Sequence, residues 1–259
     1  MSLPRMIARV CAALAILLGL IVLGGWTLHV PATQPGAAVS LVLSGLALAG
    51  IVARRRRLTL ACSAITAIFS TVSLLEYLFG RSRLLPASAL CFLVLATGFV
   101  LAQVGPPAKR SAMLGIAGLL AAAVGAAGGI AVIFGGGDAL GLGIFTGMAV
   151  QTAGGLLLLG IGAVAVALEL SQGDLRQPIW AAVGSGIFLV TIRIALLQAF
   201  SPKNQTGMSS TLALLGALFG AVVFGVFVHL ALRANLQRAL LGTVNRRLEQ
   251  ETLQRRRAE

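Results

Sequence analysis

Acidic residues are scarce in this chain of 259 residues, which has seven aspartates and glutamates against 20 lysines and arginines. Charged residues make up only 10% of the sequence, whereas hydrophobic residues make up 58%. That balance is too apolar for a soluble globular domain. It predicts that most of the chain lies in a lipid bilayer.

Cysteine and histidine are also rare, with three and two residues respectively. Cys11, Cys62 and Cys91 fall singly in apolar stretches without a Cys-x-x-Cys pair, so we expect buried, reduced thiols. His29 and His229 fall near opposite faces of the membrane, which excludes a haem held between them in one subunit. No histidine spacing suits zinc, and no Ser/His/Asp set or phosphate-binding loop is present. We expect no metal, no cofactor and no catalytic residues.

Eight long apolar stretches fill most of the sequence. A membrane-spanning helix needs about 20 mostly apolar residues, and only a helix satisfies its own backbone in lipid. The sequence therefore predicts an all-α, polytopic membrane bundle of about eight transmembrane helices at 1–232, followed by a cytoplasmic helix at 233–259. The first stretch is too long for a cleaved signal peptide. The predicted spans are 8–28, 37–53, 58–80, 87–104, 111–134, 142–168, 179–200 and 211–232.

Basic residues mark alternate junctions between these spans, notably Arg54–Arg57, Lys109–Arg110 and the polar tail. Sixteen lysines and arginines lie on the face that holds the N-terminus, three lie on the opposite face, and Arg193 lies within a span. The positive-inside rule then predicts that both termini are cytoplasmic. This distribution favours attraction to anionic lipid head groups over nucleic-acid binding.

A weak internal repeat relates the second, fourth and sixth spans. Each carries a pair of small residues seven positions apart, which lie near one helix face and allow a neighbouring backbone to approach closely. The pairs are Ala38 with Gly45, Ala89 with Ala96, and Ala153 with Gly160.

Two motifs carry a family resemblance. Residues 75–80 read Leu-Glu-Tyr-Leu-Phe-Gly, and the fourth span matches a Pro-Asn-Thr-Ala-Leu-x-Phe-Leu-Leu-Leu-Gly pattern at Pro86, Ala89, Leu90, Phe92, Leu93 and Leu95. These segments resemble the membrane-embedded input regions of bacterial sensor histidine kinases and diguanylate cyclases, although the Asn-Thr pair is missing. Residues 245–259 resemble the connector that enters a PAS or kinase domain. The resemblance implies a bacterial inner-membrane protein of a two-component or cyclase system, truncated here before its output domain.

The last span is predicted to continue into the tail as one helix. Its apolar positions follow a 3–4 spacing typical of a coiled coil, and Gly216-x-x-x-Gly220 allows two copies to pack closely. We expect a homodimer through this helix. The alternative is a basic amphipathic helix lying on the inner leaflet. The spacing comprises Phe227, Leu230, Ala234, Gln237, Leu241, Val244 and Leu248.

Arg193 is the most costly residue to place in lipid, because an arginine at mid-span costs roughly 2.5–3.5 kcal/mol. The topology puts Glu76 at a similar depth near the outer surface. We therefore hypothesise a polar cluster of Glu76, Tyr77, Gln151, Arg193 and Gln198. It is either a ligand pocket or a structural ion pair between the third and seventh spans; alternatively, Arg193 snorkels alone.

The favoured interpretation is a non-enzymatic sensory input module. It would pass a signal through the last span and its cytoplasmic helix to a kinase or cyclase output, or to a separate cytoplasmic signalling partner. The alternative is a small-molecule transporter or channel subunit. Transporters contain discontinuous helices, and the glycine-rich fifth and sixth spans are the feature of this sequence that suggests them. A structural or assembly protein of the membrane is the third class.

Overall fold

A computed structural model describes residues 3–27, 35–79, 86–133, 149–171 and 179–200 of the chain. Within these residues it contains seven α-helices and no strand. The helices are α1 (Leu3–Thr27), α2 (Pro35–Val52), α3 (Arg56–Leu78), α4 (Pro86–Val104), α5 (Pro107–Ile133), α6 (Val150–Ser171) and α7 (Ile179–Phe200).

The all-α prediction is confirmed for the described part of the chain. Five helices (α1, α3, α4, α5 and α6) are long and apolar enough to cross a membrane, and the segments Gly36–Val52 and Trp180–Ile192 are shorter apolar helices. The structure thus supports a multi-pass membrane protein. The eighth predicted span and the tail, with Gly216, Gly220 and the proposed coiled-coil positions, lie outside the described residues.

Proline begins three of the helices, at Pro35, Pro86 and Pro107. Proline suits the first helical position because its φ angle is already helical and its missing N–H would have no intrahelical partner there. The third helix begins at Arg56, two residues before the predicted span. Two of the four consecutive arginines therefore belong to the helix itself, and Arg54 and Arg55 form the turn before it.

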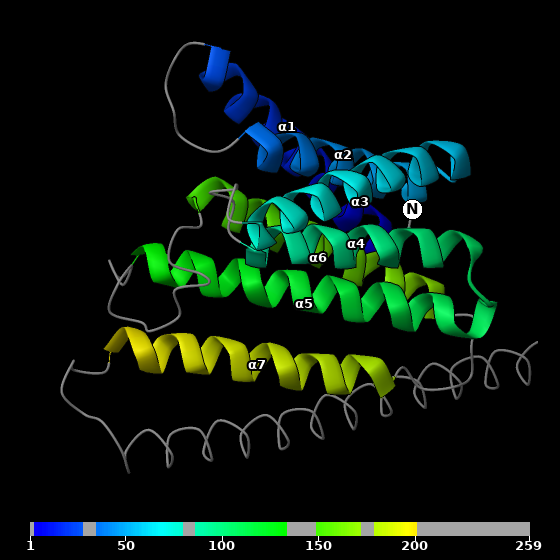
Figure 1. Ribbon diagram of the computed structural model, residues 1–259. Coiled ribbons are helices and arrows are strands. Elements are labelled where there is room, and N and C mark those ends of the chain that lie inside the picture. The colour runs from blue at the N-terminus through cyan, green and yellow to red at the C-terminus, as the bar shows by residue number, and fades with distance from the viewer. Residues whose placement is uncertain (1–2, 28–34, 80–85, 134–148, 172–178, 201–259) are drawn as a thin grey trace, which may run out of the picture.

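From α1 to α6, sequence neighbours pack side by side as antiparallel helices, whereas α7 packs against α5 rather than α6. Helices α1, α2 and α3 form one side of the bundle, α4 and α6 lie in the middle, and α5 separates them from α7 (Figure 1). Helix α3 packs against α2 and α4, and α7 packs against α5. Because each helix reverses the direction of the one before, the starts of α1, α3 and α5 lie at one end of the bundle.

Helices α5 and α6 form the most extensive interface among the described helices. Glycines allow their backbones to touch. A β-carbon on Gly160 would lie 2.5 Å from the Ala122 nitrogen and from the Gly118 carbonyl oxygen, and one on Gly125 would lie 2.6 Å from the Ala153 carbonyl oxygen. In lipid, helices associate through this kind of close packing, since burial of apolar surface gives little drive between them.

The small-residue pairs of the internal repeat all lie in packed positions. All six residues are buried, and Gly45 and Gly160 lie against the backbones of α1 and α5 respectively. The prediction that the pairs face neighbouring helices is confirmed. The three cysteines are also buried and free, as their placement in apolar stretches predicts.

Candidate functional site

Helix α3 is amphipathic in the sense opposite to that of a helix in a soluble protein. Its buried positions are polar or small, and its exposed positions are large and apolar. Such a helix faces lipid with its apolar side and neighbouring helices with its polar side. The buried residues are Thr59, Cys62, Ser63, Thr66 and Ser70, whereas Leu58, Ile65, Ile68, Phe69, Val72 and Leu75 are exposed.

We call the residues Thr59, Ser63, Thr66 and Ser70 the hydroxyl face of α3. They follow a 4-3-4 spacing, so they lie along one side of the helix. The Thr66 hydroxyl donates to the Cys62 carbonyl oxygen at 2.9 Å. The Thr59 hydroxyl lies 3.3 Å from the carbonyl oxygen of Ala47 on α2, across the interface between the helices.

The hydroxyls of Ser63 and Ser70 are buried without a hydrogen-bond partner among the described residues, as is that of Ser44 on α2. Ser44 lies eight residues before the end of α2, and Ser63 lies seven residues after the start of α3. The two helices are antiparallel neighbours, so both hydroxyls lie at about the same depth. A buried hydroxyl without a hydrogen-bond partner destabilises a fold.

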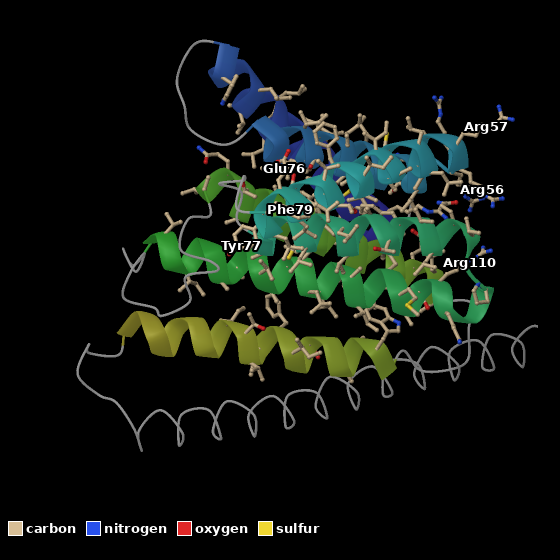
Figure 2. The ribbon with its side chains drawn as sticks, viewed as in Figure 1. Arg56, Arg57, Glu76, Tyr77, Phe79 and Arg110 are labelled. Carbon is tan, nitrogen blue, oxygen red and sulfur yellow. The ribbon has the colours of Figure 1, made fainter. Side chains whose placement is uncertain are left out.

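The two ends of α3 carry different chemistry. Arg56 and Arg57 lie at its start, and Glu76, Tyr77 and Phe79 lie at its other end (Figure 2). Tyr77 is 47% exposed and Phe79 is 76% exposed. The Leu-Glu-Tyr-Leu-Phe motif therefore presents a carboxylate and large rings at the surface of the bundle.

The predicted polar cluster is divided between separate parts of the bundle. Glu76 and Tyr77 lie near the end of α3, and Gln151 is half-buried in the first turn of α6. Arg193 and Gln198 belong to α7, and their side chains lie outside the described residues. Because α3 packs against α2 and α4 while α7 packs against α5, the layers of α4 and α5 separate the two helices (Figure 1). The ion pair between Glu76 and Arg193 stays a prediction.

The opposite end of the bundle is basic. Arg5 Nε at the start of α1 forms an ion pair with Glu169 Oε1 at the end of α6. Arg110 Nε at the start of α5 donates to the Gly105 carbonyl oxygen at 2.6 Å. Figure 2 shows Arg56, Arg57 and Arg110 together at this end, away from Glu76.

Comparison with protein-family models, curated proteins and solved structures finds no match to this chain. The resemblance to sensor input regions therefore depends on the motifs themselves. The described residues contain no group of three or more metal-ligating side chains.

The sequence interpretation missed the hydroxyl face and the Arg5–Glu169 pair. The signal for the first was available, because Thr59, Ser63, Thr66 and Ser70 repeat at coiled-coil spacing within an apolar segment. The pair joins residues 164 positions apart in the sequence, and no local pattern indicates it.

Proposed function

We propose that the chain is the membrane-embedded input module of a signalling protein. It takes up a stimulus at the end of the bundle that carries Glu76 and Phe79. It passes the change through the last span and its cytoplasmic helix to a kinase or cyclase output, as a homodimer in a bacterial inner membrane. In this proposal the basic end of the bundle faces the cytoplasm, and the positive-inside rule assigns both termini to the same side of the membrane.

One observation carries this proposal: α3 joins an exposed polar and aromatic end to a basic end through a packed face of hydroxyls. Serine and threonine hydroxyls form hydrogen bonds over a short range, and a hydroxyl can readily exchange one hydrogen-bond partner for another. When α3 slides along its axis, its lipid-facing side stays in lipid, so little apolar surface changes its surroundings. A helix packed in this way is suited to alternate between two positions.

A fusion of residues 1–259 to the core of a sensor kinase, read by a transcriptional reporter, tests the proposal. A series of one to seven alanines inserted after residue 241 rotates the output relative to the membrane bundle. If the tail transmits a helical signal, kinase output rises and falls along the series with a period near 3.5 residues. The control is the same series on a single polyleucine span.

The hydroxyl face supplies a second arm of this experiment. We expect Thr66→Val in α3 to shift the basal output of the fusion, and Ile68→Val on the lipid-facing side to leave it unchanged. Flat output across the alanine series, together with equal effects of the two substitutions, would exclude the input-module function.

The unpartnered hydroxyls of Ser44, Ser63 and Ser70 favour a second candidate, a small-molecule transporter or channel subunit. Polar groups buried at membrane depth are typical of a substrate path. Proteoliposomes of the purified chain would then release small polar solutes faster than empty liposomes, and Ser63→Leu would abolish the difference. Equal release rates for proteoliposomes and empty liposomes would exclude it.

A further inference from the structure

The turn between α2 and α3 concentrates positive charge at one place on the surface. Residues Arg54, Arg55, Arg56 and Arg57, which we call the arginine turn, are all exposed. None of them forms an ion pair with an acidic residue of the described chain. Glu169 at this end is bound to Arg5, and Glu76 lies at the other end.

Other residues at these positions would stabilise the local fold more than the arginines do. Helix α2 ends in a Schellman motif, in which the Arg55 N–H donates to the Gly50 carbonyl oxygen at 2.8 Å and the Arg54 N–H to that of Ile51 at 3.0 Å. Arg54 occupies the left-handed position of this motif, with φ of 57°. Glycine adopts that conformation freely, whereas a side chain raises its free energy.

The start of α3 is likewise an unfavourable place for cations. Arg55 makes no side-chain capping hydrogen bond, and the first turn of α3 contains no acidic residue. The positive end of the helix dipole repels the guanidinium groups of Arg56 and Arg57. The charges of the arginine turn therefore do not stabilise the structure that holds them, and an external anion would offset this repulsion.

The length of α2 places the turn at the surface of the bilayer. Its 18 residues span about 27 Å at 1.5 Å per residue, which is less than the hydrocarbon thickness of about 30 Å. The guanidinium groups that follow α2 therefore lie at the level of the lipid phosphates. Lys109 at the same end of the bundle is also exposed, but its neighbour Arg110 donates to the Gly105 carbonyl oxygen, so no cluster of unpaired guanidinium groups surrounds it in the described part of the chain.

We propose that the arginine turn is a binding site for the phosphate group of an anionic phospholipid. Guanidinium groups suit this ligand because each offers a planar pair of donors that matches two phosphate oxygens. The short turn brings four such groups to one headgroup region, and the negative charge of the lipid supplies the missing counter-ion. This site does not depend on the proposed signalling function, since the charges and backbone geometry that support it belong to the turn itself.

Native mass spectrometry of the detergent-purified full chain, titrated with phosphatidylglycerol and with phosphatidylcholine, tests the site. We expect tighter binding of phosphatidylglycerol. Each arginine near an anionic surface contributes an amount equivalent to about a fivefold change in affinity, so Arg54→Gly and Arg55→Gln should each weaken phosphatidylglycerol binding about fivefold. Lys109→Gln removes the same charge from the same end, and should change the affinity less than twofold.

Thermal unfolding in nanodiscs separates lipid binding from folding. In pure phosphatidylcholine, Arg54→Gly should raise the unfolding temperature, because glycine relieves the left-handed conformation. Phosphatidylglycerol should then stabilise the wild type more than this variant. Equal effects of Arg54→Gly, Arg55→Gln and Lys109→Gln on phosphatidylglycerol affinity would overturn the proposal. So would inorganic phosphate in phosphatidylcholine nanodiscs, if it raised the unfolding temperature as much as phosphatidylglycerol does.

Discussion

Arg5 in the first turn of α1 and Glu169 near the end of α6 form an ion pair. This contact fixes the two residues at the same end of the bundle, which requires the chain to cross the bundle an even number of times between them. It therefore agrees with the alternating direction of the six helices. It also holds α1, whose outward side is widely exposed, against α6.

The Arg5–Glu169 pair should contribute modestly to stability, because the Arg5 side chain is 39% exposed. Exposed ion pairs contribute about 0.2–1 kcal/mol. We expect a double-mutant cycle of Arg5→Gln and Glu169→Gln, measured by steric trapping in bicelles, to give a coupling free energy in that range. The coupling should decrease as salt is added. A salt-independent coupling would show that the two side chains interact through something other than charge.

Gly160 on α6 should tolerate no side chain. A β-carbon there would meet the Ala122 nitrogen and the Gly118 carbonyl oxygen, and these backbone atoms cannot move aside without separating α5 from α6. We expect Gly160→Ala to lower the free energy of unfolding by about 1–3 kcal/mol, the usual cost of overpacking. Gly154 on the same helix has open space around it, so Gly154→Ala should leave stability unchanged or slightly higher. Equal effects of the two substitutions would contradict this account of the interface.

The number and placement of the described helices could largely be predicted from the sequence. In lipid the backbone leaves few alternatives to a helix, and apolar run length locates each span without any knowledge of tertiary contacts. The prolines at 35, 86 and 107 mark helix starts. The start of α6 at Val150 could not be predicted, because residues 142–149 are mostly apolar and contain no charge or proline that would mark a helix boundary.

The candidate site was harder to predict than the fold. Depth along each span placed Glu76 and Arg193 at one level, but depth does not determine which helices are neighbours. That depends on how Gly118, Gly125 and Gly160 let particular backbones approach. The hydroxyl face of α3 could be predicted only by assuming that small polar residues form the packed side of the helix. In soluble proteins the opposite holds, since the apolar side of a helix is the buried one.

Cysteine labelling from the two sides of the membrane tests the orientation in which the basic end is cytoplasmic. Phe79 follows the last residue of α3 at one end of the bundle, Lys109 lies in the first turn of α5 at the other end, and both are exposed. An impermeant maleimide should label Phe79→Cys in intact cells and Lys109→Cys only in inverted membrane vesicles. The wild type should label weakly from either side, since Cys11, Cys62 and Cys91 are buried. Labelling of both variants from the same side would contradict the topology.

Charge exchange between Glu76 and Arg193 distinguishes a structural ion pair from two independent groups. The separation of α3 from α7 by the layers of α4 and α5 leads us to expect independence (Figure 1). In that case Glu76→Arg and Arg193→Glu should have additive effects on the unfolding free energy, within about 0.5 kcal/mol. The Arg193 substitution should have the larger effect, because Glu76 is already exposed at the end of its helix. If the double exchange instead restores the stability that each single change removes, the two side chains meet across the bundle, and the polar cluster is a single site.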